Sequence, residues 1–251
     1  MKSGLLSITF RKLDPDAVIE LARAAGLESI EWGGDIHVPP DKPDAAAAIG
    51  RRTREAGLSI SAYGSYYRLG HPDTGPIEAV LETARALETG VVRVWAGRKG
   101  SDEADPAERA AVEEDARNAC RLAADAGLKI ACEWHANTLT DTAASATSLF
   151  AAVDEPNFVT LWQPRNYQNT EFNLVDMEAA LPRLVGLHVF HWDLKTRARL
   201  PLAEGTTPWK AYLAKASTAE PLSASLEFVA DDSPERMRED AATLKRWLSE
   251  I

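Results

Sequence analysis

The chain has 251 residues, which is enough for one large α/β domain or two smaller ones. Hydrophobic residues make up 45% and charged residues 26%, so a sizeable core can form without disulfides. The net charge of −10 argues against partners such as nucleic acids or anionic membranes, which bind basic faces. No apolar run is long enough to span a membrane, and residues 1–10 lack the plan of a signal peptide. The two cysteines, Cys120 and Cys132, are too few for a disulfide framework and indicate a cytoplasmic protein.

Short apolar runs alternate with helix-like stretches along the whole chain, and a glycine closes several of these stretches. The pattern predicts eight strands, at residues 5–10, 29–32, 59–63, 91–95, 129–133, 158–162, 186–190 and 224–228. It predicts eight helices, at residues 18–25, 44–56, 77–88, 106–126, 142–153, 174–180, 208–216 and 234–248.

Eight such units in one chain of this length favour a single (β/α)8 TIM barrel over residues 1–251. The strands are continuously apolar, as is typical of parallel strands that helices cover. A doubly wound open sheet is the competing fold, but no GxGxxG motif follows the first strand. Two connections, at residues 33–43 and 96–105, are long, and long loops in compact domains tend to be functional.

Polar and aromatic side chains gather where the predicted strands end. The active site of a TIM barrel lies at the C-terminal ends of its strands. Four of the five histidines lie at these ends: His37, His135, His188 and His191. Packing explains any single one of them equally well, but their clustering on one rim favours a functional site.

Two glutamates, Glu133 and Glu227, each end an apolar strand. A carboxylate buried there needs a cationic partner, a proton or a metal ion. One interpretation is a salt bridge to a rim arginine such as Arg98 or Arg165. The other is a pair of carboxylates that binds a divalent cation.

Gln163 and His188 end the two strands between these glutamates, about one βα unit apart. They would add a neutral oxygen and an imidazole to the ligand set. Oxygen ligands with one imidazole suit Mn²⁺ or Mg²⁺, with Co²⁺ and Zn²⁺ as alternatives. Cys132 points to the opposite face of its strand from Glu133 and is expected in the core.

The chain resembles the sugar phosphate isomerase/epimerase superfamily, the xylose isomerase-like barrels, over essentially its whole length. The resemblance rests on residues 26–32 with Glu31, on Glu133-Trp-His135, on His188-Val-Phe-His191-Trp-Asp193 and on Glu227. It implies a divalent metal held by Glu, Asp, His and Glu, which Glu133, His188 and Glu227 match. Gln163 stands where the superfamily usually has Asp, which removes one negative charge and weakens metal binding. His191 is the alternative to His188 as a ligand.

The same resemblance implies an acid/base role for Glu133 and Glu227. In the family's epimerases, the metal polarises a carbonyl, one glutamate removes the adjacent proton, and the other returns a proton to the opposite face. The implied substrate-binding residues are Glu31, His37, Tyr66, Trp95, His135, Arg165, His191 and Lys195. Homo-oligomers are common in the superfamily.

Three functions follow. The first is a metal-dependent isomerase or epimerase that acts on a carbohydrate or polyol. The second is a lyase, either a dehydratase on a keto-inositol or an enzyme that opens a 3-keto-glycoside; it starts with the same proton abstraction. The third is a sugar-binding barrel without a metal, which Gln163 in place of Asp favours. DNA repair like that of endonuclease IV is disfavoured, because a three-metal cluster needs more ligands than five histidines supply.

Overall fold

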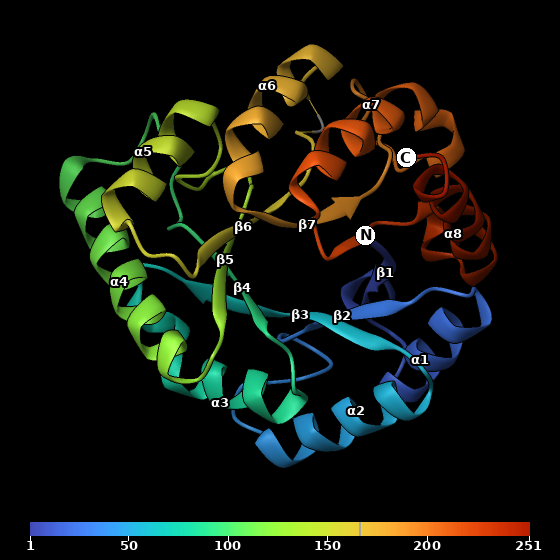
Figure 1. The fold of residues 1–251 in the computed structure, drawn as a ribbon, viewed down its shortest axis with the longest axis horizontal. Helices are drawn as coiled ribbons and strands as arrows, with labels where there is room; N and C mark the ends of the chain where they lie inside the picture. The colour runs from blue at the N-terminus through green and yellow to red at the C-terminus, as the bar shows by residue number, and fades with distance from the viewer. Residues whose placement is uncertain (166) are drawn as a thin grey trace.

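The computed structural model describes residues 1–165 and 167–251, which form a closed parallel barrel surrounded by helices (Figure 1). The strands are β1 (Lys2–Leu6), β2 (Ser29–Gly33), β3 (Ser59–Arg68), β4 (Val91–Trp95), β5 (Lys129–Glu133), β6 (Phe158–Trp162), β7 (Leu184–Val189) and β8 (Ser223–Leu226). The helices are α1 (Pro15–Ala24), α2 (Pro43–Glu55), α3 (Ile77–Leu87), α4 (Pro106–Asp125), α5 (Ala143–Val153), α6 (Thr170–Ala180), α7 (Thr206–Ala216) and α8 (Pro234–Leu248). Each strand pairs with the next in the chain, and β8 closes on β1, so the predicted (β/α)8 barrel is confirmed.

Several element bounds differ from the predicted ones. The first strand exists, but its predicted bounds are wrong: it begins at Lys2 and ends at Leu6. Residues 7–10 form a 3₁₀ turn, because the chain leaves the sheet where Ser7 Oγ accepts a hydrogen bond from Gly33 N. Helix α6 begins four residues earlier than predicted, because Asn169 caps it and accepts a hydrogen bond from Phe172 N. Strand β8 ends at Leu226, so Glu227 lies just beyond the strand.

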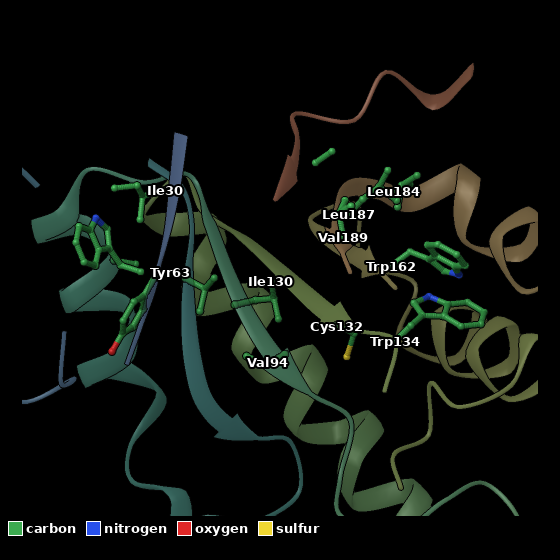
Figure 2. Close-up of a cluster of buried hydrophobic side chains, with 14 of the residues drawn as sticks. Ile30, Tyr63, Val94, Ile130, Cys132, Trp134, Trp162, Leu184, Leu187 and Val189 are labelled. Atoms are coloured by element: carbon green, nitrogen blue, oxygen red, sulfur yellow. The ribbon is translucent and has the colours of Figure 1, made fainter. Parts of the chain in front are cut away.

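The hydrophobic core has two layers. The outer layer lies between strands and helices and includes Val94, Ile130 and Cys132, which confirms the expected place of Cys132 (Figure 2). Both cysteines are free. The inner layer fills the barrel and consists of Ala62, Val91, Ala131, Val159, Leu161 and Val185.

Alternation along β4 and β5 places a charged layer next to this inner apolar layer. Val91 and Arg93 share one face of β4, and Ala131 and Glu133 share one face of β5, because side chains on a strand alternate. Gly64 on β3 makes room for the charges: a Cβ there would lie 2.7 Å from an Arg93 nitrogen and 2.9 Å from a Glu31 oxygen. The barrel therefore carries ionised side chains in its interior, towards the C-terminal ends of the strands. Across residues 1–165 and 167–251, no helix is long and apolar enough to cross a membrane.

Candidate active site

Four buried side chains from β2, β4, β5 and β7 form a ring of alternating charge inside the barrel. Arg93 contacts Glu31 through Nε at 3.0 Å and also pairs with Glu133 through Nη1. His188 closes the ring on the other side, with Nδ1 3.1 Å from Glu133 and Nε2 3.0 Å from Glu31. All four are at most 3% exposed, so these contacts replace the water that the charges have lost.

Both nitrogens of His188 face carboxylates, which favours the imidazolium form. Burial lowers the pKa of His188, but Glu31 and Glu133 outweigh burial and raise this pKa to about 10. For Glu133, burial acts to raise the pKa. The charges of Arg93 and His188 outweigh that effect and hold the pKa of Glu133 well below its ordinary value.

The carboxylate of Glu133 accepts hydrogen bonds from four side chains. Besides Arg93 and His188, it accepts hydrogen bonds from Trp95 Nε1 at 2.6 Å and from Gln163 Nε2 at 2.9 Å. Gln163 Nε2 also donates to the carbonyl oxygen of Trp134, and these two acceptors fix which end of the amide is the nitrogen. Gln163 thus acts on Glu133 as a donor.

Glu227 has the opposite environment. It is 4% exposed, and its Oε2 has no hydrogen-bond partner within the described ranges of the chain. The nearest cationic nitrogen is His188 Nδ1, at 3.8 Å. Burial raises the pKa of Glu227 to about 8, although His188 opposes the shift. This glutamate can therefore exchange a proton near neutral pH.

A cavity of about 350 Å³ opens above the charged ring, and both Glu133 and Glu227 line it. Four of the expected substrate-binding residues also line it: Tyr66, Trp95, His135 and Arg165. Its aromatic walls include Trp192 and Phe228, whose ring centroids lie 5.1 Å apart.

The other four expected substrate-binding residues lie elsewhere. Glu31 is below the cavity in the charged ring, and His37 is buried, where its ring nitrogens contact Ser7 Oγ and the Leu13 carbonyl oxygen. His191 is absent from the cavity lining and lines an adjoining pocket of about 100 Å³, which shares Arg165 and Trp192 with the cavity. Lys195 is exposed on the connection between β7 and α7 and is not among the cavity-lining residues.

The arginine partner of Glu133 is neither of the two that sequence analysis considered. Arg98 pairs with Asp73, and Arg165 pairs with Asp176. The partner is Arg93, which sequence analysis missed because it lies inside β4 and not at its end. An arginine between two valines in an apolar strand was the available signal, since such a charge needs a buried partner.

Three of the expected ligands lie close enough together to hold a metal ion. One atom each of Glu133, His188 and Glu227 lies within 4.8 Å of the other two, whereas His191 does not belong to this group. The unpartnered Oε2 of Glu227 is the kind of buried acceptor that a cation satisfies. When His188 is neutral and Glu31, Glu133 and Glu227 are ionised, these residues and Arg93 together carry a net charge of −2. One divalent cation balances this charge. These residues fit a divalent cation.

Comparison with known proteins identifies the family of the chain and relatives that share its fold. The family described as xylose isomerase-like TIM barrel matches residues 19–247. A 3-dehydroshikimate dehydratase from Bacillus anthracis is 27% identical over 180 residues, which cover 65% of this chain and 64% of that protein, less than two thirds of its length.

Two solved structures share the fold at low sequence identity. The probable 3-DHS dehydratase AsbF of Bacillus anthracis has a TM-score of 0.83 and 21% identity, with 98% of this chain and 99% of that chain covered. A D-tagatose 3-epimerase-like protein has a TM-score of 0.79 and 15% identity, with 100% and 98% covered. At these identities the likeness shows the fold alone.

Proposed function

The chain belongs to the xylose isomerase-like TIM barrel family, and from its site we propose that it is a lyase that removes water from a cyclic hydroxy ketone. The observation that carries this proposal is the unequal environment of the two glutamates. Glu133 accepts hydrogen bonds from four side chains, whereas Glu227 Oε2 accepts none within the described chain.

Epimerisation by two bases needs a proton donor on one face of the substrate and an acceptor on the other. Glu133 suits neither role, because Arg93 keeps it ionised. Hydrogen bonds from Trp95 and Gln163 also hold its carboxylate in place, whether His188 donates to it or shares a cation with it. Glu227 suits proton transfer, because burial brings its pKa near neutrality. A site with one proton-transferring glutamate favours elimination, which needs one base and an acid for the leaving group.

A divalent cation would be held by Glu133, His188 and Glu227. It would polarise the substrate ketone and so make the adjacent C–H more acidic. Glu227 has a second oxygen to take this proton. The C–H electrons form a C=C bond, and the C–O bond of the hydroxyl β to the ketone breaks. His135 lines the cavity, and its Nδ1 donates to the Ala136 carbonyl oxygen at 2.7 Å. In the imidazolium form its Nε2 carries a second proton, which passes to the departing hydroxyl so that water leaves and the neutral imidazole remains.

The name of the curated relative supplies the first substrate to test. 3-Dehydroshikimate has a ring ketone with a hydroxyl β to it, and loss of one water followed by enolisation makes its ring aromatic. We expect the purified protein with Mn²⁺ or Mg²⁺ to convert it to 3,4-dihydroxybenzoate, seen as a new aromatic absorbance and a loss of one water by mass spectrometry. A ketohexose such as D-tagatose, tested in parallel, should return unchanged.

The Glu227→Gln variant tests the base. We expect it to fold and to lose about 10²–10⁴-fold in turnover. Glu82→Gln, on the exposed face of α3, is the matched control and should keep wild-type activity. Epimerised ketohexose without loss of water would replace the lyase by an epimerase, and full activity of Glu227→Gln would remove Glu227 as the base.

A further inference from the structure

Four arginines line the active-site cavity: Arg11, Arg93, Arg165 and Arg197. Three of them have a carboxylate partner within the protein. Arg11 pairs with Asp35, Arg93 belongs to the charged ring, and Arg165 donates two hydrogen bonds to Asp176, at 2.9 and 2.7 Å. Among residues 1–165 and 167–251, the side chain of Arg197 has no ion-pair or hydrogen-bond partner, whereas the nearby Arg199 pairs with Asp232.

The connection from β7 to α7 holds Arg197 at the cavity. It forms a small hairpin, in which Trp192 and Arg199 form an antiparallel bridge and Asp193 N donates to Ala198 O at 2.9 Å. Arg197 lies in the turn of this hairpin with φ of +59°, a conformation that costs an arginine free energy, and its N–H donates to Asp193 O at 2.9 Å. The hairpin thus holds the backbone of Arg197, an exposed residue, at a position where its side chain lines the cavity.

The other three lining arginines are already paired: Arg11 with Asp35, Arg93 with Glu31 and Glu133, and Arg165 with Asp176. Their positive charges are therefore committed to carboxylates of the protein. The positive charge of Arg197 remains for a negative charge on the substrate.

We infer that Arg197 is a specificity-determining residue that binds a carboxylate of the substrate, so that the substrate class is a cyclic monocarboxylic acid and not a neutral sugar. The inference rests on the proposed function, which specifies the reacting ketone and hydroxyl of the same substrate. A guanidinium binds a carboxylate through two parallel hydrogen bonds. The neighbouring cavity walls, Trp192 and Phe228, suit the flat apolar face of an unsaturated ring.

The test is a binding measurement, so it does not depend on turnover. The probes are 3,4-dihydroxybenzoate and its neutral analogue 3,4-dihydroxybenzamide, titrated into protein loaded with Mn²⁺ and followed by calorimetry. The two probes share the ring and both hydroxyls, so the ratio of their dissociation constants isolates the carboxylate. We expect wild-type protein to bind the acid about ten-fold or more tightly than the amide.

Arg197→Met should remove this preference and bring the ratio to within about two-fold, because methionine keeps much of the length of arginine without its charge. Arg238→Met, on the exposed surface of α8, is the matched control and should keep the wild-type ratio. Equal binding of both probes by wild-type protein, an unchanged ratio in Arg197→Met, or no binding of either probe would each overturn the inference. An Arg197-dependent preference without dehydration of 3-dehydroshikimate would leave the inference standing and reject the proposed reaction.

Discussion

Arg93 pairs with both buried carboxylates of the charged ring, so its replacement is the most severe test of the electrostatics described above. Arg93→Met keeps an apolar stem of similar length and removes the charge, which leaves Glu31 and Glu133 facing each other with only His188 between them. Removing one partner of a buried ion pair costs about 3–5 kcal/mol. For a domain of this size each kcal/mol lowers the melting temperature by about 2–4 °C, so we expect a fall of about 6–20 °C.

The dependence on pH separates this electrostatic loss from a simple packing defect. In wild-type protein Arg93 lowers the pKa of Glu133, so the pair contributes stability above the ordinary pKa of a glutamate. In Arg93→Met, Glu133 can take up a proton as the pH falls, so the difference in melting temperature should be smaller at pH 5 than at pH 8. Scanning calorimetry at both values measures it, with Arg238→Met as the exposed control. A melting temperature within about 2 °C of wild type at pH 8, which is the range of a surface substitution, would refute the reasoning.

Three further predictions concern the metal ligands. The pKa of His188 is raised to about 10 and that of Glu227 to about 8, so a divalent cation should displace about two protons when it binds at pH 7. Calorimetry in buffers of different ionisation enthalpy counts the released protons. Release of fewer than one proton would contradict the ligand set. Glu31→Gln should weaken Mn²⁺ binding about 10–100-fold through the orientation of His188, and an unchanged dissociation constant would exclude this positioning role. Gln163→Asp should tighten Mn²⁺ binding and lower the melting temperature of the metal-free protein, and an unchanged affinity would place Gln163 outside the ligands.

The fold could be predicted because its signals are local. Apolar runs, capping residues and closing glycines recur in each unit, and the predicted bounds of β4, β5 and β6 are those of the structure. The first strand was misplaced because an apolar run does not show where the chain leaves its neighbours. Residues 7–10 are apolar enough for a strand, yet Ser7 Oγ is used to bind Gly33 N, and the chain turns there.

The candidate site could be predicted in part for a similar reason. The C-terminal ends of the strands converge in any TIM barrel, so Glu133, His188 and Glu227 could be grouped from their positions alone. Depth within the barrel was harder to predict. Glu31 does not line the cavity, because it lies two residues before the end of β2 and turns its carboxylate to Arg93 and His188. Arg197 lacks a carboxylate partner because of how the other arginines and the acidic residues pair across loops, and no sequence pattern reveals this pairing.

Glu133 and Glu227 illustrate why residue type and position do not assign a chemical role. Both are glutamates at the ends of apolar strands, and both line the same cavity. The donors in their vicinity differ: Arg93, Trp95, Gln163 and His188 all direct hydrogen bonds to Glu133. Since each of these donors is already committed, Glu227 keeps an unsatisfied buried oxygen, which disfavours its ionised form. In the proposed function, the loss of stability that this entails makes Glu227 reactive, because a bound cation or a proton taken from substrate relieves it.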